Sequence, residues 1–295
     1  MIELLQNVLN FALSFFAAGT LHTASPAPAD STLPIPHPVP GGIALVEAGY
    51  GLQPPKVTFN GSPVFTMRPS TDSQWIAVVG IPLSQAPGSA TVKNGNREYT
   101  FEIQSKAYPE QHLTVQKKHV NPSAEQLQRI RRESAAMNAV YTSFTSGSGW
   151  SPMAWPVNGP LSSEFGLRRF FNGEERRPHS GLDIAVPTGT PILAPADGTV
   201  VLTGDYFFNG KTVFVDHGQG LISMFCHLDS IEVSKGEKVT AGDRLARSGS
   251  TGRATGPHLH WTVSLNNARI NPLLMLSPAI PQATTQATTK GTDNG

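Results

Sequence analysis

Two short stretches of this chain carry the residue types that bind zinc. His179-Ser-Gly-Leu-Asp183 offers an imidazole and a carboxylate four residues apart, and Pro-His258-Leu-His260 offers two imidazoles two residues apart. Three nitrogens and one carboxylate are ligand types that zinc takes. A hydrolytic zinc site uses three protein ligands and keeps one position open for water, so this set predicts a metal hydrolase.

The spacing of these residues places them on shared faces. Residues Leu259–Leu265 read as a strand, so His258 and His260 are expected to point to the same side. The other pair is four residues apart, which shares a face in a strand or a helix, and Gly181 and Pro187 argue against a helix. The two pairs can therefore converge on one ion.

A further histidine, His227, lies in an apolar run that also predicts a strand. Strand alternation places His227 on the face of Phe225 and directs Cys226 away. Cys226 is therefore predicted to be a buried hydrophobe, because a nucleophile and its base must lie within hydrogen-bond reach. The residues now offer five candidates, enough for three ligands and two free imidazoles, one of which can take a proton from water.

Three motifs in this order resemble the signatures of the lysostaphin/LytM-type zinc metallopeptidases. They are His179-Ser-Gly-Leu-Asp183, Phe225-Cys-His227-Leu228 and Gly249-Ser-Thr-Gly-Arg-Ala-Thr-Gly-Pro-His258-Leu-His260. The resemblance covers roughly residues 155–276, where Phe165-Gly-Leu-Arg168 and Asn271-Pro272 also match family positions. One departure is Phe225, where the family often has Tyr.

This resemblance implies a role for each candidate and a substrate. His179, Asp183 and His260 would bind one zinc ion, while His227 and His258 would be the catalytic pair, one as general base and the other stabilising the oxyanion. The implied fold is an antiparallel β-sheet of the duplicated-hybrid-motif kind. The implied substrate is a peptide bond in peptidoglycan, and a Gram-negative periplasmic setting would favour the cross-link between D-Ala and meso-diaminopimelate.

Most elements that must position these residues are predicted to be strands. Short β-branched or aromatic runs, with Asn60-Gly61 and Asn94-Gly95 between some of them, predict a small N-terminal β-sandwich. Tyr108–Val115 and Val120–Ser123 also resemble the domain that precedes the catalytic unit in some Gram-negative relatives. We therefore expect a mainly β protein with a linker helix between two domains.

The linker helix is predicted over residues 121–144. Asn121 followed by Pro122 is one candidate start, and Ser123 with Gln126 offers a capping box as another. Apolar residues then recur at spacings of three and four, with arginines on the other side. A solvated face on a docked helix explains those arginines better than nucleic-acid recognition does.

The composition and the chain ends complete the predicted organisation. A net charge of +1 suggests no nucleic-acid partner, and the apolar stretch near the N-terminus is too short for a membrane span. That stretch predicts a signal peptide, and hence secretion across the inner membrane to the periplasm, although no Lys or Arg precedes Lys56. The predicted segments are a signal peptide at 1–24, a flexible Pro/Ala-rich linker at 25–40, the β-domain at 41–115, the helix and hinge at 116–149, the peptidase domain at 150–276 and a disordered tail at 277–295.

Two other functions fit parts of the pattern. One is a non-catalytic LytM-type activator of amidases, whose mark would be lost ligands, and all five positions are present here. The other is a cell-wall binding module with a structural zinc, which usually has four ligands including Cys. His217 is assigned a structural hydrogen-bonding role. Arg168 and the loop Glu174–Arg177 are candidates to meet substrate carboxylates, although a solvated loop explains Glu174 and Glu175 better.

Overall fold

The computed structural model describes residues 33–69, 73–113, 122–147 and 151–276. The predicted signal peptide and the tail after Ser277 lie outside these residues. Within them, no helix has the length and apolar character needed to cross a bilayer. The described chain is mainly β, as predicted.

The N-terminal part is the predicted sandwich, built from two antiparallel sheets. The first has the order β1-β5-β4 and the second β3-β2-β6-β7, and side chains such as Val46, Phe59 and Val92 form the core between them. Asn60 and Gly61 both have positive φ in the two-residue turn between β2 and β3, as the Asn-Gly pair predicts. The strands are β1 Ile43–Tyr50, β2 Val57–Phe59, β3 Ser62–Pro63, β4 Phe65–Met67, β5 Gln74–Gly80, β6 Gly88–Asn94 and β7 Arg97–Ile103.

The C-terminal part is built around one large antiparallel sheet. Its main path has the order β17-β14-β15-β16-β19-β12-β9, with β13, β18 and β20 attached to it. These strands are β9 Leu161–Ser163, β12 Leu182–Ile184, β13 Pro191–Leu193, β14 Gly198–Tyr206, β15 Gly210–Asp216, β16 Ile222–Ile231, β17 Lys238–Val239, β18 Arg244–Ser248, β19 Leu259–Leu265 and β20 Ala268–Ile270. A 3₁₀ helix, η2 Pro272–Met275, follows.

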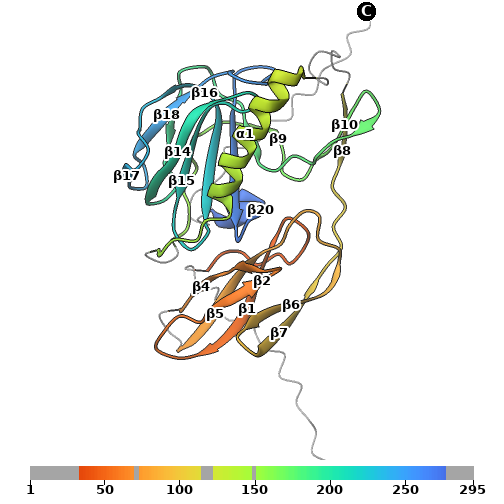
Figure 1. Ribbon diagram of the computed structural model, residues 1–295, viewed down its shortest axis with the longest axis vertical. Coiled ribbons are helices and arrows are strands. Elements are labelled where there is room, and N and C mark those ends of the chain that lie inside the picture. The colour runs from red at the N-terminus through yellow and green to blue at the C-terminus, as the bar shows by residue number, and fades with distance from the viewer. Residues whose placement is uncertain (1–32, 70–72, 114–121, 148–150, 277–295) are drawn as a thin grey trace, which may run out of the picture. The chain divides into compact units, whose positions relative to one another are not determined.

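Alternation along the central strands gives this sheet two different faces. Phe225, Trp261 and Val263 face the main hydrophobic core. Ile222, Met224 and Cys226 face the other way, toward Tyr141 of the helix α1 Ala124–Tyr141. Figure 1 shows α1 lying across this second face. The helix begins after Ser123, whose side chain forms the capping box with Gln126, so the second of the two candidate starts is the one used.

A third small sheet joins a segment of the predicted N-terminal domain to the C-terminal part. Strand β8 Glu110–Leu113 pairs in parallel with β10 Arg168–Phe171, which also pairs with β11 Glu174–Glu175. The guanidinium of Arg168 bonds Glu110 at 2.6 Å across this junction. Residues up to 113 therefore lie against the part of the chain that leads into His179.

Residues 33–40 differ from the flexible linker that their composition predicts. Ile35 N–H donates to the carbonyl of Leu274 at 3.2 Å, and His37 forms a β-bridge with Ile43. Leu33 packs against the main core, and Val39 is buried. These contacts order the segment, because a Pro-rich chain can add apolar side chains to an existing core without forming a strand.

Candidate metal centre and active site

One row of side chains crosses four neighbouring strands on the helix-bearing face of the large sheet. The registers pair Cys226 with His260 and His260 with Asp183. Asp183 in turn lies opposite Ser163. Directly opposed residues of antiparallel strands have Cβ atoms about 4.5–5.5 Å apart. Pairing of β12 with β19 therefore brings Asp183 and His260 together, although they are far apart in the sequence.

His179 joins this pair from the segment that precedes β12. Its backbone is held by two hydrogen bonds, from His179 N–H to the Leu167 carbonyl and from Gly166 N–H to the His179 carbonyl. Gly181 makes the close approach to β19 feasible, because a Cβ there would lie 2.5 Å from the Trp261 carbonyl oxygen and 2.8 Å from the His260 ring. The glycine of the His-x-Gly-x-Asp motif is thus required by packing.

The three donor atoms fit a zinc ion. His179 Nε2 lies 3.0 Å from Asp183 Oδ1 and 3.1 Å from His260 Nδ1, and the latter two atoms are 2.7 Å apart. Tetrahedral bonds of about 2.0 Å would separate ligand atoms by about 3.3 Å, so the three pairs of atoms need to open by about 0.2–0.6 Å. Within the described part of the chain, these three are the residues grouped closely enough to hold a metal.

Hydrogen bonds orient both imidazoles of this group. His179 Nδ1 donates to the Glu164 carbonyl at 2.7 Å, which leaves the lone pair on Nε2. His260 Nε2 lies 2.9 Å from Thr262 Oγ1, which directs Nδ1 toward Asp183. Such outer hydrogen bonds fix the tautomer and ring orientation of metal-binding histidines. The sequence motifs do not single out Glu164 or Thr262.

Asp183 is held as a carboxylate. Its burial alone would raise its pKa, but its interactions with the His179 and His260 side chains outweigh that effect and hold the pKa well below its ordinary value. An ionised oxygen facing two imidazole nitrogens is a suitable ligand for a divalent cation.

His227 reaches the site in a way that simple strand alternation does not predict. Between the pairs Val213–Phe225 and Lys211–Leu228, one residue of β15 faces two of β16, so β16 contains a β-bulge at Cys226 and His227. His227 has φ +60°, which is rare outside glycine. The prediction that His227 shares the face of Phe225 is therefore wrong, because the bulge turns it toward His258 and His260.

Both remaining imidazoles present a free Nε2 toward the metal group. His227 Nδ1 donates to the Thr251 carbonyl and His258 Nδ1 to the Gly256 carbonyl, each at 2.8 Å. Their ring centroids are 4.8 Å apart, and His258 Nε2 lies 3.8 Å from Asp183 Oδ1. Burial, and then the charge of His260, lower the pKa of His227 to about 4, so this ring is neutral near pH 7.

Cys226 is buried beside the site but is not a nucleophile. Its side chain lies on the helix-bearing face, and it pairs with His260. The prediction that Cys226 points away from the histidines is therefore wrong. Burial raises the pKa of its thiol to about 12, and Asn209 Nδ2 bonds its sulfur at 3.3 Å. The thiol therefore stays protonated, and the predicted inert role is kept for a different physical reason.

Arg169 is the neighbour of the metal group that the motifs did not reveal. Its Nη2 lies 3.1 Å from Ser163 Oγ and 3.4 Å from Asp183 Oδ2. Arg168, the arginine proposed from the sequence, instead bonds Glu110 and Glu175. Alternation within β10 separates the two guanidinium groups, and that signal was available in the sequence.

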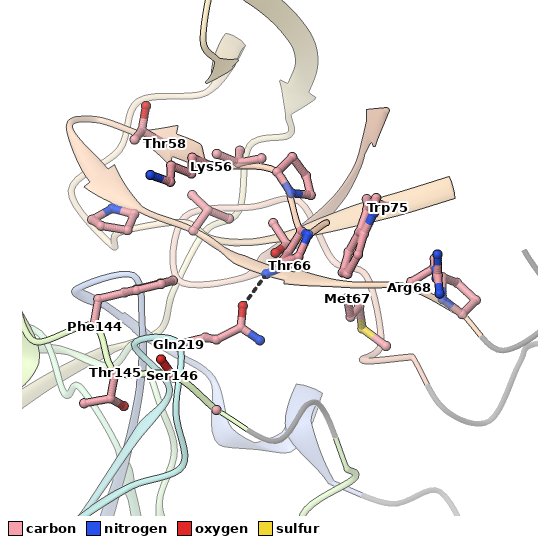
Figure 2. Close-up of a pocket in the computed structure, with 17 residues that line it drawn as sticks. Lys56, Thr58, Thr66, Met67, Arg68, Trp75, Phe144, Thr145, Ser146 and Gln219 are labelled. Atoms are coloured by element: carbon pink, nitrogen blue, oxygen red, sulfur yellow. Dashed lines mark hydrogen bonds between the residues drawn. The ribbon is translucent and has the colours of Figure 1, made fainter. Parts of the chain in front are cut away.

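A separate cavity of about 1120 Å³ lies outside this site. Figure 2 shows Trp75 and Met67 of the N-terminal part and Phe144 around it, with Thr66 N–H bonding Gln219 Oε1 at 3.1 Å. None of its described lining residues is a His, Asp, Glu or Cys, so it lacks the usual metal-binding side chains.

Two families and several proteins are similar to this chain. Residues 177–272 match peptidase family M23, and residues 36–106 match the peptidase family M23 N-terminal domain. The peptidoglycan DD-endopeptidase ShyA of Vibrio cholerae is 40% identical over 114 residues, which are 38% of this chain and 26% of ShyA. The DD-carboxypeptidase/endopeptidase Mpg of Neisseria meningitidis is 36% identical over 118 residues, 40% of this chain and 27% of Mpg. The chain thus spans about a quarter of these relatives.

A solved structure matches over almost its whole length. It is a Pseudomonas aeruginosa protein described as an M23 peptidase, with 48% sequence identity and a TM-score of 0.69. The match covers 82% of this chain and 96% of that chain. With the fold, the order of the motifs and both domain matches in agreement, this chain belongs to peptidase family M23.

Proposed function

We propose that this protein is a zinc metallo-endopeptidase that hydrolyses peptide bonds in the stem peptides or cross-links of peptidoglycan. The observation that carries the proposal is the meeting of three metal-binding atoms with two imidazoles whose Nε2 atoms are free. Three ligands leave the open coordination position that hydrolysis needs, whereas a structural site is closed by four.

Each residue of the site has a part in this proposal. His179 Nε2, Asp183 Oδ1 and His260 Nδ1 would hold one zinc ion. The ion would polarise the scissile carbonyl and lower the pKa of an attacking water. Of His227 and His258, one would accept the proton of that water and the other would donate a hydrogen bond to the developing oxyanion. The neutral ring of His227 has its proton on Nδ1, so its Nε2 can accept the proton of the water but can donate to the oxyanion only after taking up a proton.

The bond we propose is the one between D-Ala and meso-diaminopimelate. Support comes from the names of the relatives, a peptidoglycan DD-endopeptidase and a DD-carboxypeptidase/endopeptidase, both from Gram-negative bacteria. The same setting supports a signal peptide at residues 1–24 and a periplasmic location. A non-catalytic activator of amidases is less well supported, because no ligand or imidazole position has been lost.

The proposal is tested with purified sacculi and the whole chain. The zinc-loaded protein should release soluble muropeptides, a chelator should stop the release, and added zinc should restore it. Release that is unaffected by complete zinc removal would contradict a metal mechanism. Absence of release by zinc-loaded, folded protein would contradict the enzyme.

A further inference from the structure

Arg169 places a cationic group beside the metal group, and its charge is only partly satisfied within the protein. Nη2 shares its hydrogen bonds between Ser163 Oγ and the second oxygen of Asp183, and the 3.4 Å contact to Asp183 is long. The Nε atom is buried with no hydrogen-bond partner. The side chain keeps 25% of its surface exposed, so part of it remains accessible to solvent.

A second arginine, Arg253, adds to the positive charge at the same place. It lies in the loop before His258, and its guanidinium stacks over Phe208 at 4.5 Å from the ring centroid. No carboxylate pairs with it among the residues that the structure describes. Burial lowers the pKa of Arg253, and repulsion by the positive charges of Arg169 and Arg176 lowers it further.

Two other arginines in this region, Arg168 and Arg176, are paired with carboxylates. Arg168 bonds Glu110 and Glu175, and Arg176 bonds Glu174 at 2.6 Å. Two neutral imidazoles and one carboxylate leave a bound divalent zinc with net positive charge. Arg169 and Arg253 therefore add to a site that already favours an anionic ligand.

The proposed substrate carries a carboxylate next to the scissile bond. In a bond between D-Ala and the D-centre of meso-diaminopimelate, the scissile nitrogen is attached to a carbon that bears a free carboxylate. Glycine–glycine bonds inside an interpeptide bridge have no such charge. We propose that Arg169 binds this carboxylate on the leaving-group side of the scissile bond and thereby selects D-Ala–diaminopimelate cross-links over uncharged bridges, an inference that rests on the proposed peptidoglycan hydrolysis.

Arg169 has one competing role, which is to position Asp183 alone. The two roles differ in whether the substrate carboxylate matters. A positioning residue affects every substrate by the same factor, whereas a carboxylate-binding residue affects only the substrate that has the carboxylate. The two roles are therefore separated by a double-mutant-type cycle, in which Arg169 is substituted and the substrate carboxylate is replaced, singly and together.

The experiment uses two cross-linked muropeptide dimers that differ only in this group, a free carboxylate in one and a carboxamide in the other. The kcat and KM of both are measured for the wild type, Arg169→Gln and Arg169→Lys. Arg168→Gln is the matched control, since it removes the adjacent guanidinium on the other face of β10. Zinc content and thermal unfolding of each variant show that it is folded and metal-loaded.

The wild type should prefer the carboxylate dimer by about 10- to 100-fold in kcat/KM, the value of a charged hydrogen bond. Arg169→Gln should bring the ratio close to one, Arg169→Lys should keep part of it, and Arg168→Gln should keep all of it. Equal slowing of both dimers by Arg169→Gln, with the preference unchanged, would overturn the inference and assign Arg169 to Asp183.

A binding measurement separates this inference from the proposed function. Calorimetry with the product monomer, as the free acid and as the amide, compares the wild type with Arg169→Gln in the absence of turnover. Tighter binding of the acid that disappears in Arg169→Gln supports the inference even if neither dimer is hydrolysed, a result that would remove the proposed activity alone. Equal binding of acid and amide by the wild type overturns the inference.

Discussion

At the scale of single residues, the site depends on which nitrogen of each imidazole is free. The Nδ1–H groups of His179, His227 and His258 donate to backbone carbonyls, so each of these rings presents Nε2. His260 is reversed, with Nε2 toward Thr262 and Nδ1 toward Asp183. The residue types were predictable from the motifs, but this choice of atom was not, because it depends on carbonyl groups that the fold brings in.

Two alanine substitutions separate the metal ligands from the catalytic imidazoles. His260→Ala removes a donor within 3.1 Å of both partners, so zinc and hydrolysis should be lost together. His258→Ala should keep zinc and reduce kcat by about 10²–10⁴-fold, the usual loss for a general acid–base group. Metal analysis and a muropeptide release assay measure the two effects. If His258→Ala lost zinc as completely as His260→Ala does, the division of roles would be wrong.

His217 gives a pH-dependent stability that is independent of the metal group. It is buried, its Nδ1 donates to the Asp197 carbonyl, and its Nε2 bonds Ser223 Oγ at 2.9 Å. Burial lowers its pKa, with the hydrogen bond to the Asp197 carbonyl and the charges of Asp216 and Asp197 opposing the effect. The unfolded chain thus binds the proton more readily, and stability should be lost as pH falls from about 6.5 through the lower folded pKa.

The control for this effect is His217→Gln, which can keep both hydrogen bonds without titrating. The drop in Tm between about pH 7.5 and pH 5.5 should be larger for the wild type than for this variant, since all other groups titrate in both. Equal drops in the two proteins would show that His217 is not held neutral by the fold.

At the scale of elements, strand pairing explains most of the site and one irregularity explains the rest. The strand Leu259–Leu265 was predicted with its observed bounds, and its pairing with β12 places His260 opposite Asp183. Long-range register and the β16 bulge could not be predicted, because both depend on neighbouring strands that are distant in sequence. The bulge explains why His227 is in the site although strand alternation would place it on the opposite face.

Gly181 tests the close contact between the His179 segment and β19. Gly181→Ala would place a methyl group against the Trp261 carbonyl and the His260 ring, so we expect a cost of about 1–3 kcal/mol in unfolding free energy and weaker zinc binding. Gly256→Ala is the matched control, since a Cβ there meets nothing within 4 Å. Denaturant unfolding and zinc titration of both variants measure the contrast. Similar behaviour of the two would mean that the backbone approach is not tight.

At the scale of the whole molecule, the N-terminal sandwich shares a core and polar contacts with the peptidase part. Asn266 Oδ1 accepts from Gly80 N–H at 2.6 Å, and its Nδ2 donates to the Gly80 carbonyl at 2.9 Å, both buried. Phe65 and Val78 belong to the same apolar cluster as Trp261. Composition and strand spacing predicted both β units, but no local pattern indicates that two units share a core.

Asn266 is the test of this shared interface. Asn266→Gly removes both hydrogen bonds without straining the positive φ of +42°, and it leaves the buried Gly80 groups unpaired, so stability should fall by about 1–3 kcal/mol. Asn267→Gly, also at positive φ but exposed, should change stability by less than about 0.5 kcal/mol. Equal effects in chemical unfolding would argue that the Asn266 contacts add nothing to the fold.

The most direct test of the whole account is the mass of the products formed from a purified muropeptide dimer cross-linked through D-Ala and meso-diaminopimelate. The zinc-loaded protein should convert the dimer into two monomers whose summed mass exceeds that of the dimer by one water, with the new carboxyl group on D-Ala. His258→Ala, still loaded with zinc, should leave the dimer almost intact. Persistence of the dimer with folded, zinc-loaded wild type, or cleavage at a sugar linkage instead, would contradict the account.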